Sequence, residues 1–220
     1  MNELWTLLRR EIQAETRQKH VVWGMVLYTL STIFVCYLSF KQLEDRAIWN
    51  GLLWIIILFA AFNAVGRSFD REAGGYNLYL YTLAHPTAVI LSKILFNVML
   101  LALLTLLALV MYVLFLGTDV LTGADMLQFI VGLLLGAFGL SAALTLISGI
   151  AVKSGNNMGM MALLGFPIIL PTMLILMSYS ANALAGMPWG ENARNLLLMF
   201  IIDGAVVTLS YILFPYLWRD

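Results

Sequence analysis

Charge is scarce in this chain. Only 11% of its 220 residues are Asp, Glu, Lys or Arg, whereas a typical soluble domain carries about 25%. The formal net charge is zero, which excludes the overall basic field that attracts nucleic acid. Cys36 is the single cysteine, so the chain cannot form an internal disulfide or a zinc site from several cysteines.

The motifs of common enzymes are also missing. The sequence contains no H-E-x-x-H, no G-x-S-x-G and no G-x-x-x-x-G-K-[ST] phosphate loop. The chain therefore cannot bind ATP by the common P-loop route, and any ATP that drives its work must be hydrolysed by a partner. Because no nucleophile or metal-ligand set is visible, we expect no catalytic, cofactor-binding or metal-binding residues, and an intramembrane enzyme is disfavoured.

Long apolar runs are what the chain has instead. Hydrophobic residues make up 62% of it, and six runs of about twenty residues each match the length at which a helix crosses the ~30 Å hydrocarbon layer of a bilayer. Lipid offers no hydrogen-bond partners, so each backbone group must be satisfied inside its own helix. The sequence predicts one all-α membrane domain over residues 1–220, with spans at about 21–40, 47–66, 94–116, 126–152, 158–181 and 195–217.

The distribution of Lys and Arg predicts the orientation of these spans. Cytoplasmic loops of membrane proteins carry the excess of basic residues. With six spans, nine basic residues fall on the side of both termini and three on the other: Arg9, Arg10, Arg17, Lys19, Arg67, Arg71, Lys93, Lys153 and Arg219 against Lys41, Arg46 and Arg194. We therefore expect both termini in the cytoplasm. The first run is expected to be a retained anchor, because no small-residue cleavage site follows it.

The N-terminal segment has the pattern of an amphipathic helix. Leu4, Leu8 and Ile12 recur every four residues, and charged residues such as Arg9 and Arg17 take the other face. Such a helix can lie along the inner membrane surface with its apolar stripe among the lipid headgroups. The alternative is an ordinary cytosolic extension of the first span.

Two spans carry residues that shape helix packing. Gly132 and Gly136 form a G-x-x-x-G pair in the fourth span, which lets another helix approach closely. Pro167 and Pro171 lie four residues apart in the fifth span, and each removes a backbone donor and favours a kink. The kinked span suits a gate or moving helix, or it only shapes the bundle; the sequence favours neither interpretation.

Asp203 is the exceptional charge within the spans. An ionisable residue inside a membrane is costly and often functional, so Asp203 is a possible intramembrane polar site that lines a cavity or bonds to a neighbouring helix. The alternative is that the sixth span begins later and Asp203 lies near the outer interface.

The segment 67–93 is the longest internal loop of this prediction. It combines charge with glycines and tyrosines directly after the second span, a composition suited to docking a cytosolic partner through apolar anchors with charges that set the register. An interfacial elbow with tyrosines among the lipid headgroups is the alternative. The residues that we assign to coupling with a partner ATPase are Arg67, Phe69, Asp70, Arg71, Glu72 and Tyr76.

Over nearly its whole length the chain resembles the haem exporter protein B (CcmB) family. The likeness rests on the N-terminal helix, the six spans, and three local patterns in order. These are the R-x-F-x-x-acid pattern at Arg67, Phe69 and Glu72, the L-x-K pattern from Leu91 to Lys93, and the paired prolines of the fifth span.

The resemblance implies an ABC-2 type permease subunit in a bacterial inner membrane, paired as a homodimer around two CcmA-like ATPase subunits. In that family, ATP hydrolysis is coupled through the B subunit to CcmC-like and CcmD-like subunits, and the output is release of a haem-loaded periplasmic chaperone. The resemblance thus implies no cofactor bound directly by this chain: ATP acts through the partner ATPase, and the complex handles haem. Lipids surround the spans, and no nucleic acid is involved.

Two alternatives remain from the sequence. One is an ABC-2 permease for another cargo, such as a lipid, a glycan or a drug. The other is a membrane scaffold that holds a haem-handling complex together without transporting anything.

Overall fold

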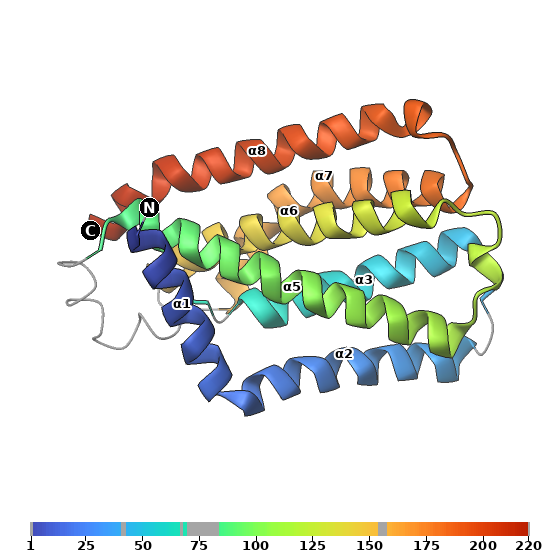
Figure 1. The fold of residues 1–220 in the computed structure, drawn as a ribbon, viewed down its shortest axis with the longest axis horizontal. Helices are drawn as coiled ribbons and strands as arrows, with labels where there is room; N and C mark the ends of the chain where they lie inside the picture. The colour runs from blue at the N-terminus through green and yellow to red at the C-terminus, as the bar shows by residue number, and fades with distance from the viewer. Residues whose placement is uncertain (1, 41–42, 67, 70–83, 154–157, 220) are drawn as a thin grey trace.

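The described part of the chain is helical. The computed structural model describes residues 2–40, 43–66, 68–69, 84–153 and 158–219 (Figure 1). Seven α-helices and one short 3-10 helix occur within these residues: α1 (Asn2–Arg17), α2 (Lys19–Phe40), α3 (Arg46–Val65), α5 (Pro86–Leu116), η1 (Asp119–Leu121), α6 (Met126–Lys153), α7 (Met158–Leu184) and α8 (Trp189–Arg219).

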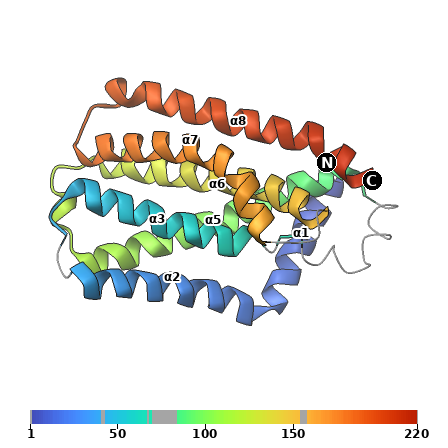
Figure 2. The same ribbon diagram turned by 180° about the vertical axis from the view of Figure 1, so that it is seen from behind.

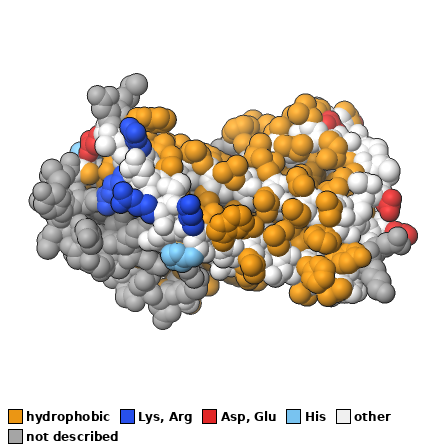
Figure 3. Space-filling view, turned by 60° about the horizontal axis from the view of Figure 1, so that its bottom comes forward, with side chains coloured by type: hydrophobic (Ala, Val, Ile, Leu, Met, Phe, Trp, Pro, Cys, Tyr) orange, Lys and Arg blue, Asp and Glu red, His pale blue; other side chains and the backbone are white. Residues whose placement is uncertain are grey.

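Six of these helices, α2, α3, α5, α6, α7 and α8, are long and apolar enough to cross a membrane. This finding confirms the prediction of an all-α membrane protein with six spans. Figure 3 shows hydrophobic side chains over the middle of one face, with Lys and Arg toward one end and Asp and Glu at both ends. This apolar surface lies between the two ends of the bundle, where the hydrocarbon layer of a bilayer would contact it.

The third span begins earlier than the sequence predicts. The sequence gives a loop over 67–93 and a span over 94–116, but α5 begins at Pro86. Proline suits the first turn of a helix, where its missing N–H needs no partner. Ser92 and Lys93, whose polarity favours a loop in the sequence, are instead buried inside the helix. The sixth span also begins earlier, because α8 starts at Trp189.

Helix α6 is the centre of the bundle. It contacts α3, α5, α7 and α8, and 72% of its membrane-spanning window is buried, against 17% for α2. Glycines allow this close packing. A Cβ at Gly132 would lie 2.6 Å from the ring of Tyr179, and a Cβ at Gly136 would lie 2.5 Å from the ring of Trp54. The G-x-x-x-G pair thus lies where α6 meets α7 and α3.

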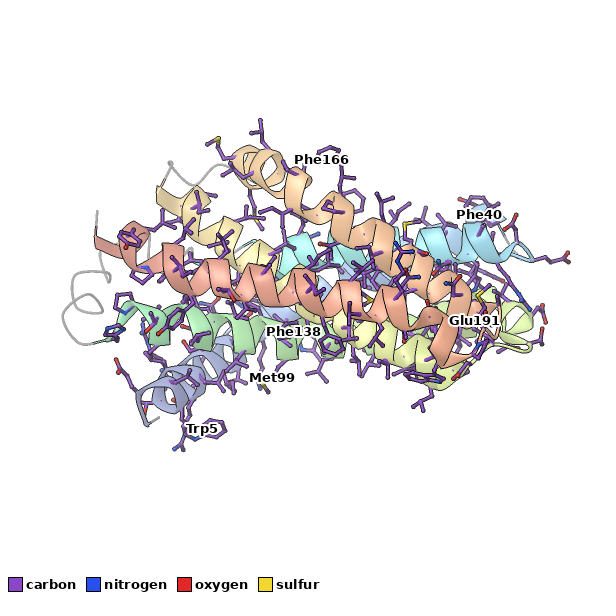
Figure 4. All side chains as sticks on the ribbon, turned by 90° about the horizontal axis from the view of Figure 1, so that it is seen from above. Trp5, Phe40, Met99, Phe138, Phe166 and Glu191 are labelled. Carbon is purple, nitrogen blue, oxygen red and sulfur yellow. The ribbon has the colours of Figure 1, made fainter. Side chains whose placement is uncertain are left out.

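Helix α7 bends away from the bundle in its first half. Figures 2 and 4 show this part of α7, marked by Phe166 in Figure 4, turning outward. Pro167 and Pro171 lie inside this helix and are exposed. A proline in a helix interior removes one hydrogen bond and clashes with the preceding turn. The bend therefore has an identifiable cause in the two prolines.

The second half of α7 is tied to α3 by buried hydrogen bonds. Asn50 Nδ2 donates to the Met177 carbonyl oxygen at 2.9 Å, and Trp54 Nε1 donates to Ser180 Oγ at 2.7 Å. Ser180 Oγ in turn donates to Asn50 Oδ1 at 2.8 Å. Hydrogen bonds between membrane helices hold them in register. All three of these bonds lie in the second half of α7, after the two prolines.

Helix α1 crosses the end of the bundle at an angle to α2 (Figures 1 and 2). The chain turns at Gln18, whose N–H donates to the Glu15 carbonyl oxygen at 2.9 Å, so α1 is not a continuation of the first span. Leu8 is buried and Leu7 packs on the core beneath it, whereas Trp5 is exposed. Part of the apolar stripe therefore faces the bundle, and the position of α1 on a membrane surface stays a prediction.

Candidate functional site

The candidate site lies at the end of the bundle that carries both chain termini, which we call the termini end (Figures 1 and 2). Here α1 packs on the first turns of α5, and the chain leaves α3 through Ser68 and Phe69. These two residues immediately precede the predicted coupling residues Asp70, Arg71 and Glu72 in the sequence. The contacts around Ser68 and Phe69 define the site.

Lys93 of α5 is the central polar residue. Its side chain is 3% exposed, and its Nζ donates to the Ser68 carbonyl oxygen at 2.6 Å and lies 3.4 Å from Glu11 Oε1. The ammonium also lies 4.8 Å from the centre of the Phe69 ring, within the range of a cation–π interaction. A buried ammonium is tolerated only when it is paired and hydrogen-bonded, and these three groups supply that environment.

Phe69 is held among three helices. Its side chain is 3% exposed, and its ring centre lies 5.6 Å from that of Phe214 in α8. On the α6 side, a Cβ at Gly149 would lie 3.5 Å from the Phe69 ring, an ordinary van der Waals distance, so the ring packs against α6 at this residue. Together with the Lys93 contact, the ring therefore joins α5, α6 and α8.

Hydrogen bonds fix the backbone around Ser68. Asn97 Nδ2 donates to Ser68 Oγ at 2.6 Å and to Thr145 Oγ1 of α6 at 2.9 Å. Ser148 Oγ, also in α6, donates to the Gly66 carbonyl oxygen at 3.4 Å. Most of these groups are buried, where an unsatisfied polar atom costs about 1–3 kcal/mol. The exit of the chain from α3 is thus specified by α5 and α6.

Helix α1 joins the same cluster through two carboxylates. The His85 backbone N–H, at the start of α5, donates to Glu3 Oε1 at 2.6 Å. The first N–H groups of a helix lack partners within the helix, and a carboxylate there is favoured by the helix dipole. Glu11 meets Lys93 two turns further along α5. Glu3 and Glu11 therefore attach α1 along the first turns of α5.

The structure places one of the six predicted coupling residues. Phe69 is described, and it is buried rather than exposed for contact with a partner, because its ring fills the space beside Gly149 and Phe214. The other five lie outside the described residues: Arg67, Asp70, Arg71, Glu72 and Tyr76.

Sequence reasoning missed the polar residues that hold Phe69 in place. Lys93 entered the sequence analysis only in the charge count and the L-x-K pattern, and Asn97 and Ser68 did not enter it at all. One signal was present: a lysine within an apolar helix requires a partner, and intramembrane ionisable residues are candidates for function. The structure shows that the two family patterns, around Phe69 and from Leu91 to Lys93, meet in space.

Asp203 lies away from this cluster, in the middle of α8. It is 4% exposed and packs against Gly139 of α6, so the interpretation that places it near an end of the span is wrong. The early start of α8 at Trp189 is the reason. Among the described residues, Asp203 Oδ2 has no hydrogen-bond partner.

The arrangement can transmit displacement. Ser68 and Phe69 contact α5, α6 and α8 directly and α1 through Lys93. Because packed interiors are stiff and transmit strain, a force on the chain just after Phe69 acts on all four helices.

Comparison with known proteins identifies the family. No curated protein matches the chain. A family model described as CcmB protein matches residues 2–215, which is essentially the whole chain. The chain therefore belongs to the CcmB family, the membrane permease subunits of the haem-export ABC system of cytochrome c maturation.

Proposed function

We propose that this chain converts ATP hydrolysis by a cytosolic CcmA-like subunit into movement of its membrane helices, and that the segment after Phe69 receives the force. The output is haem export, with ATP-driven release of the haem-loaded periplasmic chaperone. ATP is bound by the partner ATPase, and haem is handled by the complex rather than by a site in this chain.

The proposed assembly is a homodimer of this chain with two ATPase subunits, joined by CcmC-like and CcmD-like membrane subunits. It lies in a bacterial inner membrane with both termini in the cytoplasm. The excess of basic residues at the termini end supports this orientation. The family membership supports an ABC system with an ATPase partner.

The observation that carries the proposal is the buried anchor at Ser68 and Phe69. Asp70, Arg71 and Glu72 follow it without an intervening residue, so a partner bound to these charges acts on a point fixed to α5, α6 and α8. Glu3 and Glu11 extend the connection to α1. ATP can drive this movement only if the two nucleotide states of the partner bind the segment differently.

Charge reversal tests the proposal. In the complex with its native partners, we expect Asp70→Lys, Arg71→Glu and Glu72→Lys together to weaken co-purification of the ATPase and to abolish its stimulated activity. Control reversals at the opposite end, Glu44→Lys and Asp119→Lys, change exposed charges and should leave both unchanged. Normal assembly and stimulation in the triple variant would remove the assignment of this segment.

Deletion of the gene tests the output. We expect cells that lack this chain to lose covalent haem staining of their c-type cytochromes, and re-expression of the wild-type chain to restore it. Normal staining in the deletion strain would exclude the cytochrome role and favour a permease for another cargo. A complex that holds the haem-handling subunits but lacks an ATPase would favour a scaffold.

A further inference from the structure

The exposed face of α1 is basic. Arg9, Arg10 and Arg17 are exposed, and so is Lys19, with which α2 begins. Trp5 lies four residues before Arg9, and Arg17 lies eight residues after it, so these three side chains share one stripe of the helix. Figure 3 shows Lys and Arg side chains gathered toward the termini end, beside hydrophobic side chains. We call Arg9, Arg10, Arg17 and Lys19 the basic patch.

The carboxylates of α1 do not neutralise this patch. Glu11 is paired with Lys93, and its side chain is only 14% exposed. Glu15 follows Glu11 by four residues, lies on the same side of the helix and is partly buried. Glu3 accepts from the His85 backbone N–H. Among the residues that the structure describes, none of the four basic side chains forms an ion pair, so α1 presents positive charge outward.

The basic face of α1 is turned toward the surrounding lipid. Leu8 is buried, and Leu7 packs on the core beneath α1, so part of the apolar stripe is taken up by the bundle. Figure 4 shows Trp5, on the opposite side of α1, pointing away from the bundle and across its long axis. The long axis of a six-span bundle crosses the bilayer, so this direction lies along the membrane surface.

The start of α2 sets the level of the patch in the bilayer. Lys19, Trp23 and Leu27 follow one another at intervals of four residues, and all three are exposed, the last two by about two-thirds. A charged, an aromatic and an aliphatic side chain thus succeed each other along one side of the first span. This is the order of a bilayer from the phosphates through the interface, where tryptophans gather, to the acyl chains. The basic patch therefore lies at the level of the lipid phosphates.

From this arrangement we propose that the basic patch binds the phosphate groups of anionic phospholipids in the leaflet around the termini end, with phosphatidylglycerol as the simplest such lipid. The guanidinium groups of the three arginines present planar pairs of N–H donors that match phosphate oxygens. The bound lipids hold α1 at the membrane surface, while Glu3 and Glu11 hold it on α5. This surface goes beyond the proposed coupling function, and it stands or falls separately because its test measures bound lipid and not ATP turnover.

The surroundings of the patch favour lipid over an acidic protein surface. Exposed basic residues attract either one. The patch, however, continues without a break into Trp23 and Leu27, exposed residues of a membrane span, and a cytosolic protein does not enter that layer. Clusters of four or more basic residues directly beside a membrane span are typical of contact with anionic lipid.

Competition between lipids tests the preference for anionic headgroups. The full-length chain in detergent is incubated with mixed micelles that contain equal amounts of phosphatidylglycerol and phosphatidylcholine with identical acyl chains, and retained lipid is counted by native mass spectrometry. Each Lys or Arg near a membrane surface contributes about fivefold to binding of anionic lipid. We therefore expect phosphatidylglycerol to be favoured by about tenfold or more, and added salt to reduce this preference. Equal retention of the two lipids, or a preference for phosphatidylcholine, would overturn the proposal.

Neutral variants locate the lipid on the patch. Arg9→Gln, Arg10→Gln and Arg17→Gln keep good helix formers at exposed positions, so the triple variant should fold. It should retain less phosphatidylglycerol by about tenfold or more, and Arg17→Gln alone by about fivefold. Arg194→Gln is the matched single variant, because it removes one exposed basic charge at the opposite end, and it should bind like the wild type. Wild-type retention in the triple variant, or equal loss in the two single variants, would reject the patch.

The same triple variant separates lipid from a protein occupant. In the complex with the native partners, we expect it to co-purify with the ATPase as the wild type does, because the patch faces the membrane. Loss of the ATPase from the triple variant, whatever its lipid content, would assign the patch to a protein contact and overturn the proposal.

Discussion

At the scale of single residues, Lys93 shows how one buried charge can organise the end of a membrane bundle. Its Nζ meets a backbone carbonyl oxygen, a carboxylate from α1 and an aromatic ring. These partners come from two segments of the chain: Glu11 from α1, and Ser68 with Phe69 from the residues that follow α3. The cost of removing the ammonium from water is offset by these partners. The stability of this end of the bundle should therefore depend on Lys93.

Lys93→Met therefore has a defined expected cost. Methionine keeps the length and the apolar stem but removes the hydrogen bond to Ser68 and the contact with Glu11. We expect the free energy of unfolding to fall by about 1.5–3 kcal/mol, the value of a hydrogen bond to a charged group, in thermal unfolding in detergent. Lys19→Met, at an exposed position nearby, should change it by less than about 0.5 kcal/mol.

Gly139 and Asp203 form a second pair that can be tested at this scale. A Cβ on Gly139 would clash with the Asp203 carboxylate, so Gly139→Ala should lower the free energy of unfolding by about 1–3 kcal/mol through overpacking. In an Asp203→Ala background the same change should cost much less, because the clashing atoms are gone. If thermal unfolding gives the same cost in both backgrounds, the Asp203 carboxylate is not the group with which the new methyl group collides.

At the scale of elements, α7 divides into two parts with different connections. Its second half is hydrogen-bonded to α3 through Asn50, Trp54 and Ser180. Its first half bends outward at Pro167 and Pro171 (Figures 2 and 4). The bend at the prolines is where a gate in α7 would move, and the gate interpretation stays a prediction.

Replacing both prolines tests the gate interpretation. Pro167→Ala with Pro171→Ala restores two backbone donors, and a proline inside a helix costs about 3 kcal/mol relative to alanine. We expect a higher unfolding temperature together with reduced covalent haem in c-type cytochromes. Pro188→Ala, in the exposed turn between α7 and α8, should change neither. If the double variant matures cytochromes at the wild-type level, the prolines only shape the bundle.

The elements were predictable from the sequence to different degrees. The six spans followed from length and apolarity alone, because lipid imposes both. The start of α5 did not, since Lys93 is polar and its partners Ser68 and Glu11 are brought to it only by the fold. The contact between Phe69 and Lys93 is likewise a tertiary contact. The spacing of these residues along the chain does not predict it.

At the scale of the whole molecule, the two ends of the bundle differ in their connections. At the termini end, the helices are joined to one another through contacts of α1, Lys93 and Phe69. The opposite end is joined through Asp125, which accepts from Trp189 Nε1 at 2.8 Å, and through Arg46, which donates to the Thr122 carbonyl oxygen at 2.8 Å. Helix α6 contacts α3, α5, α7 and α8, so it is one route by which a movement at one end can reach the other.

The direction of that movement across the membrane depends on which end faces the cytoplasm, and the chain offers a direct measurement. Cys36 is its only cysteine, so Cys36→Ser provides a background for single labels. Gln13→Cys marks the termini end and Glu191→Cys the opposite end, both at exposed positions. With a membrane-impermeant maleimide, we expect Glu191→Cys to react in intact spheroplasts and Gln13→Cys only after the membrane is opened, because the basic residues hold the termini end inside. The reverse pattern would place Phe69 and its neighbours on the outer side, where no cytosolic ATPase could reach them.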